Sequence, residues 1–88
     1  MKYMIHPVVV DAFQYGIDEA PEWFHEKLQT DDIIVFKGFD EIKDVCMVRT
    51  LEVVLPAHEG DYIIRGETGE LFPCRKEVFE KTFVKVEN

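Results

Sequence analysis

The sequence contains no serine, two cysteines and no long run of apolar residues. Without serine, a serine nucleophile is excluded. Two well-separated cysteines, Cys46 and Cys74, are too few for the disulfide framework of a small secreted domain, and they indicate a reducing compartment. A membrane-spanning helix needs about 18 consecutive apolar residues, and residues 1–7 lack the apolar core of a secretory signal. We therefore expect a cytoplasmic protein without a membrane partner.

Basic residues are also scarce, with 10 Lys and Arg against 18 Asp and Glu and a net charge of −8. Binding to the phosphate backbone of a nucleic acid needs a basic surface, so direct nucleic-acid binding is disfavoured. The acidic surplus lies early in the chain, because residues 1–60 hold twelve acidic and five basic residues. Residues 61–88 hold six acidic and five basic residues, so an anionic ligand would be expected there.

The patterns that usually mark catalytic or metal centres are missing. His6, His25 and His58 are far apart in the sequence, and no Cys-x-x-Cys or His-x-x-x-His pair is present, whereas zinc sites normally show such spacing. The glycines do not form a phosphate-binding fingerprint. Paired carboxylates such as Asp31-Asp32 are common on the solvated faces of acid-rich chains. We predict no metal, no cofactor and no enzymatic activity.

The length of 88 residues, 47% of them hydrophobic, predicts one packed domain covering residues 1–88. Periodicity and turn residues predict an α+β fold, with about five or six antiparallel strands in a small sheet and one or two short helices packed on it. The expected strands are 4–15, 33–36, 45–55 with an interruption near residue 50, 62–65, 71–74 and 83–86. The expected helices are 21–28 and 75–82. A turn is expected at 56–61 and a tight hairpin loop at 67–70, where Gly69 is available for positive φ.

The last third of the chain contains the best candidate for a ligand site: Tyr62, Arg65, Phe72, Arg75 and Lys76. Aromatic faces, a guanidinium group and the start of a helix together suit a phosphate-bearing ligand. In this interpretation Arg65 and the Arg75-Lys76 pair bind phosphate, while Tyr62 and Phe72 stack or pack against the ligand.

Two interpretations of Arg65 remain open at this point. Alternation along the strand places Arg65 among apolar neighbours, close to Phe72 or Cys74 across the hairpin. The guanidinium group is then either paired with an acid such as Glu70 or free to bind a ligand.

Residues 60–74, which read GDYIIRGETGELFPC, and residues 79–83, which read FEKTF, resemble a family of small phage and prophage proteins. Residues 10–14 and 21–24 are similar to the N-terminal half of that family, whereas residues 31–50 depart from it. Phe72 stands where many relatives have tyrosine. The resemblance covers most of the chain and implies a phage origin, but it brings no assigned reaction.

Small phage proteins often act against host defence, and the resemblance therefore implies a counter-defence role. We predict a non-enzymatic binding protein that sequesters an anionic nucleotide-type signalling molecule, such as a cyclic nucleotide or an ADP-ribose derivative. A protomer of this size offers little concavity, so a ligand pocket would form more readily between subunits. We therefore expect a homo-oligomer.

The acidic first two thirds of the chain support an alternative of a different class. An acidic protein that imitates the charge of DNA would bind a basic defence protein or nuclease. The candidate contact residues are Asp31, Asp32, Asp40 and Asp44. A third alternative is a minor component of the virion or of its assembly.

Overall fold

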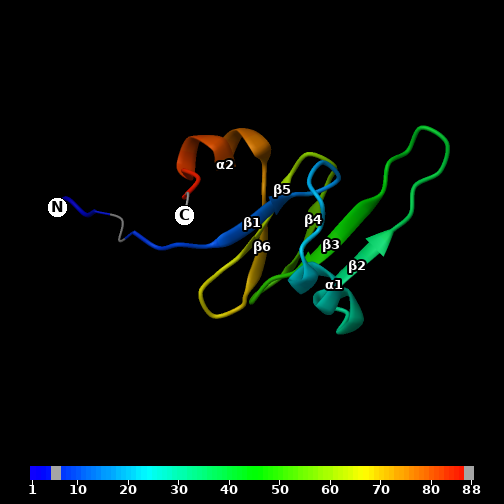
Figure 1. Ribbon diagram of the computed structural model, residues 1–88, viewed down its shortest axis with the longest axis horizontal. Helices are drawn as coiled ribbons and strands as arrows, with labels where there is room; N and C mark the ends of the chain where they lie inside the picture. The colour runs from blue at the N-terminus through cyan, green and yellow to red at the C-terminus, as the bar shows by residue number, and fades with distance from the viewer. Residues whose placement is uncertain (5–6, 87–88) are drawn as a thin grey trace.

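The computed structural model describes residues 1–4 and 7–86, which form six strands and two short helices (Figure 1). The elements are β1 (Asp11–Gln14), α1 (Glu22–Gln29), β2 (Ile33–Phe36), β3 (Val45–Arg49), β4 (Val54–Ala57), β5 (Tyr62–Arg65), β6 (Leu71–Cys74) and α2 (Lys76–Thr82). All four strand pairs are antiparallel. The predicted α+β class, with about five or six antiparallel strands and one or two short helices, is confirmed, but the strands form two sheets and not one.

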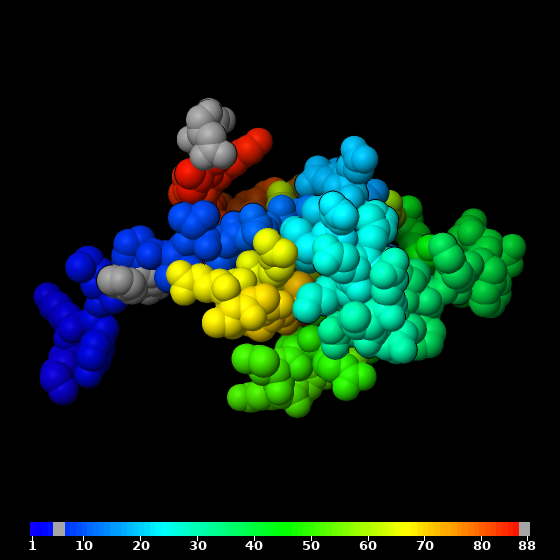
Figure 2. All heavy atoms as spheres, turned by 60° about the horizontal axis from the view of Figure 1, so that its bottom comes forward, coloured from blue at the N-terminus to red at the C-terminus, as the bar shows by residue number. Residues whose placement is uncertain are grey.

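The six strands divide into two three-stranded sheets. One has the order β1-β5-β6, and the other is the meander β2-β3-β4. Strands β3 and β4 pack against β6, and α1 packs against β2. The molecule is elongated, and the long connection between β2 and β3 projects from the end opposite the N-terminal segment (Figures 1 and 2).

The hydrophobic core lies between the inner faces of the two sheets. The first sheet contributes Phe13, Ile63 and Leu71. These residues share one face because Phe13 lies opposite Ile63 in the β1–β5 ladder and alternate residues of a strand point to the same side. The second sheet and α1 contribute the remaining buried residues of the cluster: Ile33, Cys46, Val48, Ala57 and Phe24.

Both helices occur where the sequence predicts them, but they cover different parts of the molecule. Helix α1 follows Pro21, has Glu22 in its first turn and buries Phe24 in the core. A proline before the first turn and an acidic residue within it both favour a helix start. Helix α2 has no buried residue. It lies against the outer face of the first sheet, where Phe79 stacks on Tyr62.

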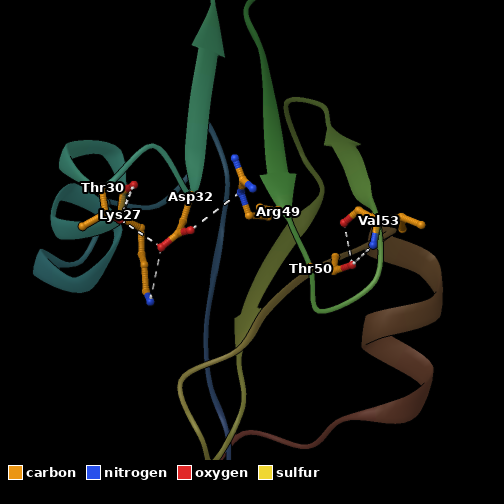
Figure 3. Close-up of polar contacts among 6 residues, drawn as sticks. All are labelled: Lys27, Thr30, Asp32, Arg49, Thr50 and Val53. Atoms are coloured by element: carbon orange, nitrogen blue, oxygen red, sulfur yellow. Dashed lines mark hydrogen bonds and ion pairs between the residues drawn. The ribbon is translucent and has the colours of Figure 1, made fainter.

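The two predicted turns around the hairpins are present. The interruption expected near residue 50 is a turn in which the Thr50 hydroxyl donates to the Val53 carbonyl at 2.6 Å (Figure 3). Between β5 and β6, the Gly66 N–H donates to the Glu70 carbonyl at 2.8 Å. Gly69 in this turn has φ +87°, which glycine adopts without steric cost.

Three boundaries differ from the prediction because strand pairing decides them. The β-rich segment 4–15 forms a strand from Asp11 onward, since its partner β5 ends at Arg65 opposite Asp11; residues 5 and 6 lie outside the described part. The expected strand 83–86 is not a strand, and Phe83 stacks on Phe79 instead, with ring centroids 4.7 Å apart. The expected turn at 56–61 begins later, because Pro56 and Ala57 belong to β4. Proline is tolerated there because β4 is an edge strand.

The inner faces of the sheets are expected to dominate the free energy of unfolding. Ile63 is 0% exposed, whereas Ile34 on the outer face of β2 is 45% exposed. Ile63→Ala should lower the free energy of unfolding by about 2–5 kcal/mol, while Ile34→Ala should lower it by less than about 1 kcal/mol. Urea denaturation followed by circular dichroism measures both values. Equal losses in the two variants would contradict the assignment of the core.

Candidate functional site

The five residues predicted to bind an anion do not converge on one point. Tyr62 and Phe72 share the outer face of the first sheet. Tyr62 is two residues from Ile64 on β5 and so points to the same side, and Phe72 lies directly opposite Ile64 on β6. Arg65 lies opposite Leu71 and therefore occupies the inner face. The expected proximity of Arg65 to Phe72 or Cys74 across the hairpin is wrong. The observed register pairs Arg65 with Leu71, one residue from the expected Phe72, so Phe72 and Cys74 lie on the outer face.

The guanidinium group of Arg65 is already occupied. Its Nη2 donates to Asp11 Oδ2 at 2.8 Å, and its Cζ lies 5.5 Å from the centroid of the Trp23 ring. Glu70 is not its partner, because the Glu70 carboxylate accepts hydrogen bonds from Thr68. Arg65 pairs with Asp11 because the two residues lie directly opposite each other in the β1–β5 ladder. Of the two interpretations of Arg65, the structure supports the paired one.

The ring of Tyr62 is also engaged within the chain. Phe79 of α2 stacks on it with centroids 3.9 Å apart and an interplanar angle of 10°. The Tyr62 hydroxyl donates to Glu80 Oε2 at 3.2 Å. Burial and the hydrogen bond to the Glu80 carboxylate raise the pKa of Tyr62. A base stacking on this face of Tyr62 would therefore have to displace α2.

Arg75 and Lys76 are exposed at the start of α2. Arg65 pairs with the first residue of β6, and Arg75 follows its last residue. At about 3.3 Å per residue, the four positions from Leu71 to Arg75 separate the two sites by about 13 Å along the strand. The three basic residues thus do not form a single phosphate-binding cluster.

The four candidate aspartates lie at the two ends of the β2–β3 hairpin. Asp31 and Asp32 precede β2. Asp32 accepts a hydrogen bond from the Thr30 hydroxyl at 2.9 Å and is 3.9 Å from Lys27 Nζ and 3.8 Å from Arg49 Nε (Figure 3). Asp31 is exposed, and its φ of 62° is in the left-handed region.

Asp40 and Asp44 lie in the loop at the other end of this hairpin. Asp44 accepts a hydrogen bond from the Gly38 N–H at 2.8 Å and is 3.4 Å from Lys37 Nζ. These contacts, the Gly38 N–H first, lower the pKa of Asp44. Asp40 is exposed with a φ of 56°, which aspartate tolerates better than most residues. Asp31 and Asp40 are therefore the most available acids of the four.

Between these two acidic ends lies an apolar surface that the structure leaves uncovered. Alternation and register place six apolar side chains on the outer face of the second sheet: Ile34, Phe36, Val45, Met47, Val54 and Pro56. The charged side chain on the same face is that of Arg49, which lies opposite Val54 and has its Nε 3.8 Å from Asp32. Phe36 is 59% exposed and Val54 is 51% exposed. Ile34, Met47 and Pro56 form one row across all three strands. We call these six residues the outer apolar face.

Sequence reasoning missed the outer apolar face, although a signal for it was present. Residues 33–36 read IIVF, and such a run without polar alternation is typical of a strand that is covered on both sides. In the structure, Ile33 and Val35 point to the core, while Ile34 and Phe36 point outward. Strand β2 is therefore apolar on both faces, although only its inner face is covered by other described residues.

The thiols and the titratable groups do not form a reactive centre in the described part of the chain. Within residues 1–4 and 7–86, no group of three or more His, Cys, Asp and Glu side chains could hold a metal ion; His6 lies outside these residues. Burial raises the pKa of the Cys46 thiol to about 11 and also raises that of Cys74. A nucleophilic cysteine needs the opposite shift.

In the described residues, neither helix has the length and apolar character needed to cross a bilayer. Comparisons with protein-family models, with curated proteins and with solved structures find no match to the chain. Its function therefore has to be inferred from its own geometry and chemistry.

The contacts of Arg65 predict a structural effect when it is replaced. A partly exposed ion pair contributes about 0.2–1 kcal/mol and a cation–π contact about 0.5–1 kcal/mol. Arg65→Ala should therefore lower the free energy of unfolding by about 1–2 kcal/mol and alter the fluorescence of Trp23. A double-mutant cycle with Asp11→Asn should give a coupling energy below about 1 kcal/mol. If the free energy of unfolding of Arg65→Ala equals that of the wild type, these contacts do not stabilise the fold.

The raised pKa of Cys46 predicts a loss of stability at alkaline pH. The unfolded thiol deprotonates near 9.0 and the folded one near 11, so the folded chain binds more protons between these values. The free energy of unfolding should consequently fall as the pH rises from about 9 to about 11. Denaturation curves at several pH values measure this slope, which should be smaller in Cys46→Ala. An unchanged slope in that variant would assign the effect to another group, such as Tyr15, whose pKa burial raises to about 12.

Proposed function

We propose that the protein is a non-enzymatic protein-binding module whose binding surface is the outer apolar face of the second sheet. The observation that carries this proposal is the group of apolar side chains left uncovered on three adjacent strands. Interface centres are rich in aromatic residues and methionine, and here Phe36 and Met47 lie among aliphatic neighbours. Large contiguous apolar patches of this kind mark interaction sites.

The charges around the face support a basic partner. Exposed Asp31 lies at one end of the hairpin that carries the face, and exposed Asp40 lies at the other. With a net charge of −8, the chain attracts positively charged proteins over long distances. The partner that fits has an apolar centre bordered by basic side chains.

The phage-type sequence pattern suggests where this partner is found. A small acidic binding protein of a phage would act in the cytoplasm of an infected cell and block a host defence protein or nuclease. The acidic inhibitor considered from the sequence thus becomes the preferred candidate. Sequestration of an anionic nucleotide has weaker support, because Arg65 is paired with Asp11 and Tyr62 is covered by Phe79.

The proposal is tested by locating the contact surface with a photoreactive amino acid. The cross-linker p-benzoylphenylalanine replaces Phe36 in one variant and Val78 in another, which is exposed on α2 away from this face. We expect position 36, and not position 78, to capture a specific host protein, identified by mass spectrometry. The purified partner is then titrated against the protein by calorimetry.

Substitutions in the face should weaken this defined complex. Phe36→Asp should raise the Kd by about 30-fold or more, as expected for the loss of a central aromatic contact. Val78→Asp is the matched control and should change the Kd by less than about threefold. Equal effects of the two substitutions would contradict the proposal. So would native mass spectra in which a small molecule from challenged cells is retained by the wild type and lost in Arg65→Ala.

A further inference from the structure

The open edge of β1 is a second surface that the proposed function does not use. Strand β1 pairs with β5 on one side and is the edge of its sheet. The Tyr15 N–H donates to the Asp61 carbonyl at 2.8 Å, so the odd-numbered residues direct their backbone groups toward β5. The Gln14 N–H points the other way and donates to Asp18 Oδ2 at 2.9 Å.

This alternation leaves a short row of backbone groups on the open side. In β1, Ala12 directs its N–H and C=O groups away from β5. Residues 7–10 continue the direction of β1 (Figure 1), and extending the same alternation assigns the backbone groups of Val10 and Val8 to the same side. None of these outward groups forms a hydrogen bond with another described residue. Asp18 and its turn close the edge at Gln14, so the open part is five residues long, from Val8 to Ala12.

The same segment borders a groove of about 680 Å³. The opposite wall is formed by α2 and the residues after it, including Phe79, Phe83 and Val86. Val8 and Val9 are exposed beside it, Val9 to 73%. An extended segment lying here would gain main-chain hydrogen bonds from the edge and apolar contacts from the groove, as in β-strand addition.

We propose that a second copy of this chain occupies the edge, with residues 8–12 of the two copies paired antiparallel about a two-fold axis at Val10. A two-fold axis perpendicular to an edge strand makes the same strand of the partner antiparallel to it. Val10 then faces Val10 of the partner subunit, and Val8 faces Ala12 of the partner subunit. All of these residues direct their backbone groups outward, so about six hydrogen bonds form.

The charges agree with this register. Asp11 faces Val9 of the partner subunit, so the two Asp11 side chains are not directly opposite each other, where like charges would destabilise the pair. Residues 1–10 contain Lys2 and no acidic residue, in a chain of net charge −8. The segment that each copy offers is thus the least acidic part of the chain, and its three consecutive valines favour a strand. These features fit a second copy better than an unrelated peptide.

The register is tested by placing like or opposite charges across the axis. Val10→Lys puts two lysines opposite each other and should raise the dimer Kd by about tenfold or more. Val9→Lys is the matched control, because its lysine faces Asp11 of the partner subunit, and it should leave the Kd unchanged or lower it. Sedimentation equilibrium measures the Kd of both variants and of the wild type, with circular dichroism as the check on folding.

A disulfide gives a second measurement that does not depend on destabilising the chain. Val9 and Asp11 of the partner subunit form a non-hydrogen-bonded pair, with Cα atoms about 4.5 Å apart and closer Cβ atoms, which suits a disulfide. The double variant Val9→Cys with Asp11→Cys should form a covalent dimer on mild oxidation, whereas Val9→Cys alone and the wild type should not. A monomeric wild type, equal Kd values for the two lysine variants, or no disulfide between positions 9 and 11 would each overturn the proposal.

Discussion

The burial of one face of each sheet against the other is the constraint on which the whole structure depends. A sheet with one apolar face has to bury that face against another element, and here each sheet covers the inner face of the other. Ile63 and Leu71 of the first sheet meet Cys46 and Val48 of the second, and Phe24 of α1 closes the cluster. Among the described residues, α1 is the helix that joins this core, and the outer face of the second sheet and the free edge of β1 remain uncovered.

This constraint also explains the contacts of the charged residues. Arg65 is the last residue of β5 and lies on the inner face of its sheet, half-buried at the border of the core. A guanidinium group at that depth needs a partner, and Asp11 and the ring of Trp23 supply one. Arg65, which the sequence suggested as a ligand-binding residue, thus has a structural role beside the core. The exposed acids, such as Asp31 and Asp40, are left at the ends of a hairpin whose outer face is apolar.

The two proposed surfaces differ in the interaction that they offer. The outer apolar face presents side chains, so its specificity would come from packing and from the acids around it. The edge of β1 presents backbone groups, so its affinity would come from main-chain hydrogen bonds in a fixed register. They involve different sheets, and a dimer formed through residues 8–12 would leave Phe36 and Met47 free in both copies. Such a dimer would present two outer apolar faces to a partner, which increases the apparent affinity of the complex.

The sequence by itself determined the fold class, the positions of both helices and most strands, and the left-handed turn at Gly69, because these depend on local periodicity and turn chemistry. Only the tertiary structure decided the division into two sheets, the start of β1 at Asp11 and the packing of Phe83 on α2, since each depends on which strand or ring lies alongside. The candidate site was the least predictable part. Arg65 and Tyr62 are near in sequence, but strand alternation places them on opposite faces, each with a partner from a distant segment.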